Sequence, residues 1–402
     1  MKILLVNKFL FEKGGAETYI FRLGNYFRSI GHEVQFFGME DKNNIAGNEW
    51  DIYIKNIDFH KKSPEMLLYP FRIIYSLEAR RKIKLIIKLF NPDVVHLNNF
   101  NYQITPSIIN EIKKHNLPLI FTAHDYQLIC PNHLLYQPNR EIICEECITS
   151  GFIRCVKNNC IHGSKLRSIL GFLESTLYHG LKTYSLIDKI VCPSEFMEKK
   201  MLQKPVFAGK TVIMHNPFRK TKENRVTNKG NYVIYFGRFS IEKGINTLIN
   251  VCKRLPEIQF TFAGGGPLEH LLKGIPNINN AGFLTGDALT KMISEALFSI
   301  YPSEWYENYP FSVIESIAYG TPVIGADIGG IPEIIENGNN GLLFQPASED
   351  DLSEKILTFW NNRRLLEEMT KNCLATEFET PEGHGQKLFD LYNQVIKSGA
   401  NK

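Results

Sequence analysis

Two glutamates, Glu307 and Glu315, have a spacing that suits a ligand with two sugar rings. Glu307 lies in a predicted loop and Glu315 in a predicted helix, 311–319. A helical rise of about 1.5 Å per residue over most of this spacing separates the carboxylates by roughly 10 Å. Each carboxylate accepts from two neighbouring hydroxyls, and the helix start at Pro310–Phe311 favours an anion between them. For such a pair alone, an exposed acidic helix face is the commoner explanation.

Two cations, Arg238 and Lys243, lie on a glycine-bounded turn. They follow the predicted strand 232–236 and Gly237, and they precede a predicted helix, 245–255. Lysine supplies a point charge and arginine a fork of donors, which together suit a diphosphate. Solvated surface cations are the alternative, and the position between a strand end and a helix start argues against it.

These motifs resemble those of retaining glycosyltransferases with the GT-B fold, family 4 in particular, of the bacterial polysaccharide-biosynthesis type. The resemblance covers nearly the whole chain. It implies an α/β fold with two doubly wound, Rossmann-like domains facing across a cleft. It also implies transfer of a hexose from a UDP- or GDP-sugar to a sugar hydroxyl, such as that of a lipid-linked oligosaccharide.

The resemblance also assigns roles to individual residues. His124, at the end of a predicted strand, would hold sugar hydroxyls and stabilise developing charge, although a lone histidine is more often structural. The implied catalytic set is His124, Arg238, Lys243 and Glu307. The implied donor-binding set is Gly14, Gly15, Gly237, Arg238, Lys243, Gly265, Phe283, Leu284, Glu307, Asn308, Tyr309, Pro310, Phe311 and Glu315. Independently of the resemblance, four further polar residues also end predicted strands and are candidate acceptor contacts: Asn98, Asn99, Ser194 and Glu195.

The sequence contains no Asp-x-Asp, the usual metal-binding element beside a nucleotide diphosphate. Charge on the departing diphosphate would therefore be met by the two cations, the helix start and the Gly14–Gly15 amides, without a metal. Front-face transfer with retention, in which the leaving phosphate helps to deprotonate the acceptor, is what the resemblance implies.

Apolar runs that end in polar residues predict two parallel sheets. The predicted strands are 2–7, 32–38, 93–97, 117–123, 189–193 and 211–215 in the first half. In the second half they are 232–236, 259–263, a strand that ends in 280–284, 299–301 and 322–326. Predicted helices are 11–30, 245–255, 292–297, 311–319, 349–360 and 383–397. The expected domains are 1–218 and 232–382, joined by a linker at 219–231, with 383–402 packing back on the first.

Composition is that of an ordinary globular protein, with 44% apolar and 22% charged residues. A net charge of +4 is too small to predict nucleic-acid binding. No apolar run approaches the roughly 18 residues of a membrane span. The first apolar run, 2–6, is too short for an export signal, so we expect a cytoplasmic protein with reduced thiols.

Five of the eight cysteines lie close together in the sequence, in an insert at about 130–160. They are Cys130, Cys144, Cys147, Cys155 and Cys160. Four thiolates suit tetrahedral zinc in a structural site. The spacing matches no standard zinc ribbon, and His162 or a disulfide is an alternative to one ligand.

The segment 61–88 carries eight lysines and arginines against two glutamates. Its apolar residues mostly fit one or two helical faces. Peripheral contact with the anionic inner face of a membrane and packing on the core with a solvated basic side are both open interpretations.

Two other functional classes fit parts of the pattern. A nucleotide-sugar epimerase or phosphorylase would share the fold and the nucleotide donor. A non-catalytic, metal-stapled binding module would account for the cysteines, but it leaves the cation and glutamate pairs unexplained.

Overall fold

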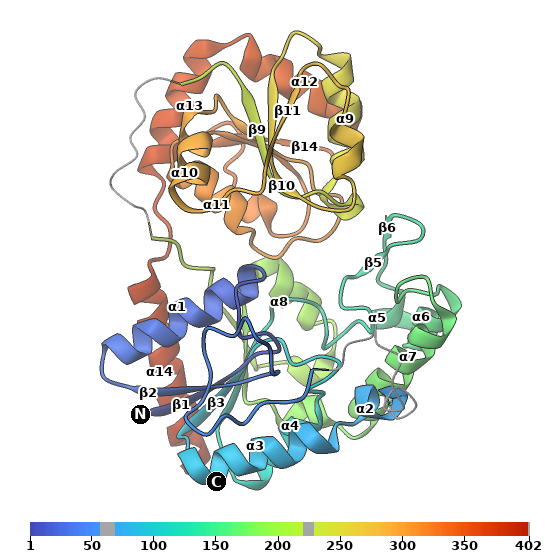
Figure 1. Cartoon of the computed structure of the whole chain (residues 1–402), viewed down its shortest axis with the longest axis vertical. Coiled ribbons are helices and arrows are strands. Elements are labelled where there is room, and N and C mark those ends of the chain that lie inside the picture. The colour runs from blue at the N-terminus through green and yellow to red at the C-terminus, as the bar shows by residue number, and fades with distance from the viewer. Residues whose placement is uncertain (57–68, 220–228, 401–402) are drawn as a thin grey trace. The chain divides into compact units, whose positions relative to one another are not determined.

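The computed structural model describes residues 1–56, 69–219 and 229–400 and contains two compact units (Figure 1). The first unit comprises Met1–Asn139, Cys144–Asn216 and Pro381–Lys402, and the second comprises Arg140–Ile143 and Pro217–Thr380. Most of the predicted linker 219–231 lies outside the described residues, as does the first part of the basic segment 61–88.

The first unit is built on a six-stranded parallel sheet in the order β2-β1-β3-β4-β7-β8. Its strands are β1 (Lys2–Val6), β2 (Glu33–Phe37), β3 (Val94–Leu97), β4 (Leu119–Thr122), β7 (Lys189–Cys192) and β8 (Thr211–Ile213). Its helices are α1 (Gly15–Ser29), α2 (Tyr69–Ile74), α3 (Leu77–Phe90), α4 (Ser107–Lys114), α5 (Glu146–Ser150), α6 (Ile153–Lys157), α7 (Lys165–Gly180), α8 (Glu195–Met201) and α14 (Pro381–Ala400). A small sheet of β5 (Tyr136–Gln137) and β6 (Ile142–Ile143) lies in the cysteine insert.

The second unit is built on another six-stranded parallel sheet, in the order β11-β10-β9-β12-β13-β14. Its strands are β9 (Val233–Arg238), β10 (Phe260–Gly265), β11 (Ile278–Gly282), β12 (Ser299–Tyr301), β13 (Val323–Ala326) and β14 (Gly341–Phe344). Its helices are α9 (Ile245–Arg254), α10 (Gly286–Glu295), α11 (Phe311–Ala318), α12 (Glu349–Trp360) and α13 (Arg363–Ala375).

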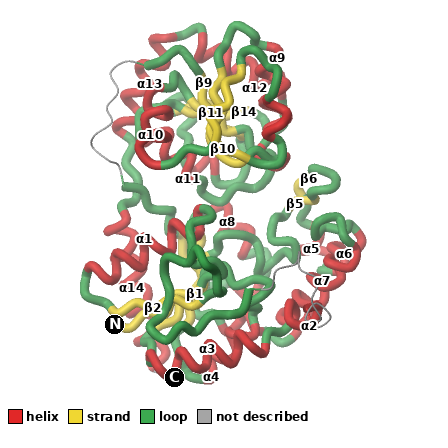
Figure 2. Tube along the Cα trace, in the orientation of Figure 1, coloured by secondary structure: helices red, strands yellow, loops and turns green. Residues whose placement is uncertain are grey.

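Both sheets therefore have the predicted doubly wound, parallel architecture. The strand order reverses between β1 and β3 in the first sheet and between β9 and β12 in the second. Ligands of open α/β sheets bind beyond the carboxyl ends of the strands at such a reversal. Figure 2 shows how loops follow the strands in each unit. The residues after these four strands are consequently the first place to look for a site.

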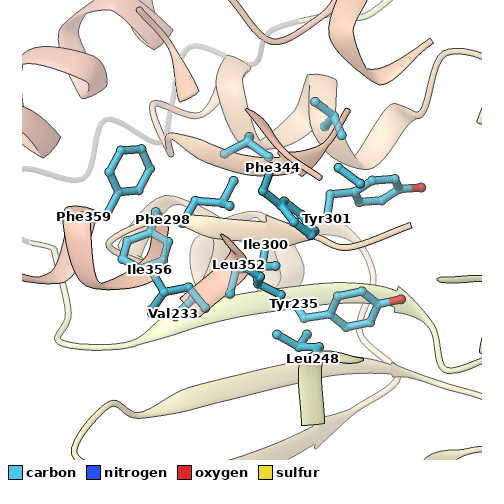
Figure 3. Packing of buried hydrophobic residues seen from close by; sticks show 14 of the residues in the cluster. Val233, Tyr235, Leu248, Phe298, Ile300, Tyr301, Phe344, Leu352, Ile356 and Phe359 are labelled. Carbon is cyan, nitrogen blue, oxygen red and sulfur yellow. The ribbon is translucent and has the colours of Figure 1, made fainter. Parts of the chain in front are cut away.

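Burial of apolar strand residues forms the core of each unit. In the second unit, β9 and β12 contribute Val233, Tyr235, Ile300 and Tyr301, and helices cover them with residues such as Leu248 (Figure 3). Strands that are buried on both faces need continuous apolar runs, so these strands could be predicted from the sequence.

The C-terminal helix α14 belongs to the first unit and packs against α1 (Figure 1). A Cβ atom on Gly385 would lie 2.2 Å from the ring of Tyr26, so any larger residue would force this ring to move. Leu388 and Tyr392 of α14 are fully buried in the core of the first unit.

Several elements differ from the sequence prediction. The sequence gives little sign of α7, a helix of 16 residues in the insert region. The fully buried or nearly buried residues of α7 are Ser168, Gly171, Ser175 and Tyr178, so its inner face lacks the apolar stripe that reveals a helix. The short strand β14 was also missed.

None of the helices among the described residues is long and apolar enough to cross a membrane. Helix α3 buries Ile83, Ile86 and Phe90 and leaves Leu85 and Leu89 exposed among lysines and arginines.

Candidate active site

The charged part of the candidate site follows β9 and β12, the two strands at the reversal of the second sheet. Arg238 ends β9 and is exposed, and Lys243 lies five residues later in a short 3-10 turn, Ile241–Lys243. Glu307 lies in the loop between β12 and α11. The predicted cation pair and the first predicted glutamate thus occupy neighbouring loops of one unit.

Lys243 and Glu307 form an ion pair, with Lys243 Nζ 2.5 Å from Glu307 Oε1. Lys243 also donates to the hydroxyl of Tyr301 at 3.2 Å and lies 5.3 Å from the ring centroid of Trp305. The side chains of Lys243 and Glu307 are 19% and 8% exposed. A mostly buried pair with several partners has one defined geometry, unlike a surface ion pair.

Three donors converge on one carboxylate oxygen of Glu307. Ser303 Oγ and Trp305 Nε1 each donate to Oε1 at 2.6 Å. Lys243 Nζ donates to the same oxygen at 2.5 Å. Within the described part of the chain, Oε2 accepts no hydrogen bond, so the fixed carboxylate keeps an oxygen for a ligand hydroxyl.

The ion pair keeps both groups charged despite their burial. Burial alone would raise the pKa of Glu307, but Lys243, Ser303 and Trp305 outweigh it and lower that pKa. Burial alone would lower the pKa of Lys243, but the charge of Glu307 outweighs it and raises that pKa. The site therefore presents a fixed ammonium group and a fixed carboxylate.

Two glycines bring these loops together. Gly244 has a φ of +70°, and a Cβ there would lie 1.8 Å from the carbonyl oxygen of Pro302. Gly329 has a φ of +63°, and a Cβ there would lie 2.4 Å from the carbonyl oxygen of Glu307, which also accepts from Gly330 N at 2.7 Å. Only glycine fits both the backbone conformation and the space at these two positions.

Other predicted donor-binding residues follow the neighbouring strands of the same sheet. Gly237 lies at the end of β9 and Gly265 at the end of β10, and these two strands are adjacent in the sheet. Phe283 and Leu284 come just after β11. Phe283 is 81% exposed, whereas Leu284 is partly buried and packs against a small core cluster that includes Ile234 and Phe236. Because the sheet is parallel, all these strand ends share one edge.

Helix α11 begins at Phe311, with Pro310 as its N-cap residue and no capping side chain. Glu315 is partly exposed on this helix. Of the four residues that precede the helix, Glu307 and Tyr309 are buried and Asn308 and Pro310 are partly exposed. The predicted helix start after the Glu307 loop is confirmed.

The first unit has a separate group of predicted site residues, which are neutral. His124 follows β4 and is partly exposed, and its Nε2 donates to Oδ1 of the fully buried Asn98, which follows β3, at 2.8 Å. Burial lowers the pKa of His124 to about 3. A neutral imidazole can hold sugar hydroxyls but brings no charge of its own.

The two predicted glycines of this unit lie at the start of α1. Gly14 is the N-cap residue and Gly15 the first helical residue, and both are exposed. Glu17, two residues further on, is buried and accepts from Asn7 Nδ2 at 3.1 Å. The glycines thus leave helix-start amides accessible, while Glu17 has a structural role.

The candidate acceptor contacts differ from one another. Ser194 is fully buried and caps α8 by accepting from Met197 N at 3.0 Å. This cap explains why a serine follows the strand β7 and precedes the helix. Glu195 is exposed and pairs with Lys199 at 3.4 Å. Asn99 N donates to Asn7 Oδ1 at 3.0 Å, which links the ends of β3 and β1.

The five cysteines of the insert line one small cavity. Cys130 Sγ donates to Asn132 Oδ1 at 2.9 Å, and Cys144 Sγ accepts from Gln137 Nε2 at 3.0 Å. As they stand, the described His, Cys, Asp and Glu side chains form no group of three or more that could hold a metal ion. All the described cysteines are free thiols.

The comparison with protein families decides what this arrangement belongs to. Residues 13–220 match the family model described as Glycosyltransferase Family 4, and residues 218–374 match the model described as Glycosyl transferases group 1. The chain belongs to glycosyltransferase family 4. Both halves of this glycosyltransferase are thereby accounted for, including the two loops that carry Lys243 and Glu307.

Curated relatives are similar to this glycosyltransferase over parts of their length. Sulfoquinovosyl transferase SQD2 of Arabidopsis thaliana is 36% identical over 34% of this chain, and the match spans 28% of that protein. Glycosyltransferase MJ1178 of Methanocaldococcus jannaschii is 26% identical over 53% of this chain and 60% of its own. A 42.6 kDa protein in the cps region of Klebsiella pneumoniae is 23% identical over 83% of this chain and 87% of its own.

Solved structures share the fold of the whole chain. Sucrose-phosphate synthase of Thermosynechococcus elongatus superposes with a TM-score of 0.72 at 17% identity, covering 99% of both chains. Anabaena HepE, in a structure with UDP, gives 0.69 at 16% identity, covering 98% of this chain and 100% of its own. At such identities the likeness supports the GT-B fold alone, and the predicted fold class is confirmed.

Sequence reasoning missed the residues that hold the site in place. Ser303, Trp305 and Tyr301 contact the ion pair, and Gly329 sits against the backbone of Glu307. The Gly329–Gly330 pair was the available signal, because a Gly-Gly pair outside a helix often marks a close backbone approach.

Proposed function

We propose that the protein is a retaining glycosyltransferase that moves a hexose from a nucleoside-diphosphate sugar to a sugar hydroxyl. Lys243 and Arg238 neutralise the leaving diphosphate, together with the amides at the start of α11. Glu307 binds hydroxyls of the hexose and Glu315 those of the ribose. His124 and the Gly14–Gly15 amides act on the same donor.

The observation that carries this proposal is the Lys243–Glu307 pair at the strand reversal of the second sheet. An ammonium group fixed beside a carboxylate offers a counter-charge for phosphate and an acceptor for a hydroxyl in one place. Exposed Arg238 adds a second cation. A donor with a diphosphate next to a sugar ring matches this arrangement of charges.

The finer assignments rest on chemistry and on relatives. HepE of Anabaena has been crystallised with UDP, which supports a uridine donor, and the cps-region relative supports a glycan acceptor in surface polysaccharide synthesis. Metal-independent transfer is supported by the cations that surround the proposed diphosphate position. Retention follows from the proposed front-face attack, in which the leaving phosphate takes the acceptor proton.

A lipid-linked acceptor would place the enzyme at a membrane surface. Helix α3 offers exposed Leu85 and Leu89 beside Arg81, Lys84 and Lys88, which is typical of a helix that lies on an anionic leaflet. Co-sedimentation with vesicles of anionic and of neutral lipid tests this contact, with Leu85→Gln as the variant. Equal binding to both vesicle types would contradict it.

The zinc site in the cysteine insert stays a prediction. Zinc would require Cys130 and Cys144 to exchange their amide partners for the metal. Metal analysis of the purified protein, compared with a Cys130→Ser variant, tests it. A metal-free wild-type protein that is folded and stable would rule zinc out.

Donor turnover is the test of the proposed function. Purified protein is screened by thermal shift against UDP-, GDP- and ADP-sugars, and the donor that stabilises it is incubated with and without glycan acceptors. We expect release of the nucleoside diphosphate to depend on the acceptor. Conversion of the donor alone would instead indicate an epimerase, and an absence of both binding and turnover would contradict the proposal.

A further inference from the structure

A chain of hydrogen bonds in the first unit begins and ends on the C-terminal helix α14. Its first link joins His384 of α14 to Tyr19 of α1, with 2.9 Å between His384 Nε2 and the tyrosine hydroxyl. Its last link joins Tyr392 of α14 to His96 of β3, with 2.6 Å between the Tyr392 hydroxyl and His96 Nδ1. Thr122 of β4 lies between His96 and Tyr19, at 2.7 Å and 3.5 Å respectively.

For a neutral His384 ring, the chemistry of the groups sets the direction of every bond. His384 Nδ1 lies 3.1 Å from the carbonyl oxygen of His215, which can only accept, so this nitrogen carries the proton. Nε2 of the neutral ring must then accept from the Tyr19 hydroxyl. Because Tyr19 has one proton, it can only accept from Thr122.

The same reasoning continues to the other end. Thr122 donates to Tyr19 and therefore accepts from His96 Nε2, which leaves His96 Nδ1 to accept from Tyr392. All five side chains are at most 2% exposed. In this arrangement each hydroxyl or ring proton is used, so no member can rotate without breaking a buried hydrogen bond.

One member of this network, Tyr19, lies beside His124. The rings of Tyr19 and His124 are in edge contact, with centroids 5.1 Å apart and an angle of 69° between their planes. The Tyr19 ring also meets the His384 ring edge-on at 5.4 Å. Asn98 holds the Nε2 end of His124, and Tyr19 packs against its ring, so Tyr19 helps to define how His124 is presented.

We propose that α14 positions His124 through Tyr19, with His384 as the residue that holds the Tyr19 hydroxyl. His384 and Tyr19 are positioning residues, since neither is assigned a contact with the donor. The inference rests on the proposed function for its consequence in catalysis, because His124 is taken to hold the hexose. The geometry of the network itself does not depend on that function.

Tyr19→Phe tests the proposal, because it removes only the hydroxyl and keeps the ring beside His124. Tyr26→Phe is the matched control, since Tyr26 lies on the same helix, packs against Gly385 of α14 and is outside the network. The unfolding free energy of both variants is measured first. Should Tyr19→Phe prove too unstable, Tyr392→Phe weakens the far end of the network and is expected to act in the same direction.

The first measurement needs no activity. In protein labelled with ¹⁵N-histidine, the His124 ring signals are assigned by their loss in His124→Gln. We expect wild type to show one neutral tautomer with Nε2 protonated, Tyr19→Phe to shift these signals toward a tautomer mixture, and Tyr26→Phe to leave them in place. Unchanged His124 signals in Tyr19→Phe would overturn the proposal, as would equal shifts in both variants.

The second measurement is steady-state transfer with the donor found above. We expect Tyr19→Phe to lower kcat by up to about 10²-fold, as expected of a displaced catalytic group, and to change the donor KM much less. Tyr26→Phe should retain wild-type kcat. If the wild-type protein has no transferase activity but Tyr19→Phe still shifts the His124 signals, the positioning proposal is supported and the proposed function is contradicted. The two proposals can therefore fail separately.

Discussion

The two sheets carry different chemistry at the carboxyl ends of their strands. After β9 and β12, the second unit holds an ion pair whose members stay charged, Lys243 and Glu307. After β3 and β4, the first unit holds Asn98 and a histidine, His124, that burial keeps neutral. Ten of the eleven histidines belong to the first unit.

This difference shows how two similar scaffolds come to suit different chemical groups. A diphosphate needs fixed cations, which remain charged when buried only if a carboxylate accompanies them. Sugar hydroxyls are neutral and are better met by amides and imidazoles, which have both donors and acceptors. We therefore expect substitutions in the second unit to act through charge and those in the first unit to act through orientation.

The largest expected effect is that of Lys243→Ala, which removes the cation proposed to meet the leaving diphosphate. We expect kcat to fall by about 10²–10³-fold, as for the loss of one transition-state donor. Lys253→Ala, at an exposed position on α9 of the same unit, is the control. Near-normal kinetics of Lys243→Ala would contradict the expectation that substitutions in the second unit act through charge.

The next effect is on stability in acid, and it should be larger in the first unit. Burial lowers the pKa of His96, His124 and His133 to about 3, so each stays neutral in the folded state while its unfolded counterpart gains a proton below about pH 6.5. Each such histidine costs about 2 kcal/mol of stability by pH 5, and the loss continues as pH falls toward 3. Burial raises the pKa of Asp125 to about 7 and that of Glu174 to about 8, so these two carboxyls offset part of the loss.

Tryptophan fluorescence can assign the acid transition to a unit. Trp50 lies in the first unit, and Trp305 and Trp360 lie in the second. Trp50 in a Trp305→Phe/Trp360→Phe variant should report unfolding at a higher pH than the two remaining tryptophans in Trp50→Phe. In the second unit, the lowered pKa of Glu307 predicts that its stabilising effect is lost only below about pH 4.5. Acid unfolding at the same pH in both variants would contradict the expected difference between the two units.

A smaller effect should separate the two glutamates. We expect Glu315→Ala to weaken the affinity for free nucleoside diphosphate about tenfold, because a charged hydrogen-bond partner of the ribose is lost. Glu307→Ala should mainly impair sugar transfer. Calorimetric titration with the nucleotide and steady-state transfer measure the two quantities. Equal effects of both variants on nucleotide affinity would contradict the assigned roles.

The smallest expected effect is that of Tyr301→Phe, which removes the 3.2 Å hydrogen bond from Lys243 and keeps the ring. One such bond contributes about 1 kcal/mol, so we expect kcat to fall about fivefold. Because Glu307 still fixes Lys243, this loss should be smaller than that of Tyr19→Phe in the first unit. A larger loss would mean that orientation matters as much as charge in the second unit.

Much of the fold was predictable because buried parallel strands are local apolar runs. Eleven of the twelve strands of the two main sheets were predicted close to their observed bounds, and β14 was missed. Helix α7 was missed because its buried face is made of serine, glycine and tyrosine. Predicted site residues also lie at strand ends, since polar residues directly after an apolar run are visible in the sequence.

The sequence by itself determined which residues lie at the carboxyl ends of the strands, because the alternation of apolar runs and polar ends is a local property. Only the tertiary structure decided which of them meet. Lys243 and Glu307 are 64 residues apart and Tyr19 and His384 are 365 apart, and no local pattern encodes such pairs. They form because glycines allow two backbones to touch and because buried polar groups must find partners wherever the fold brings them.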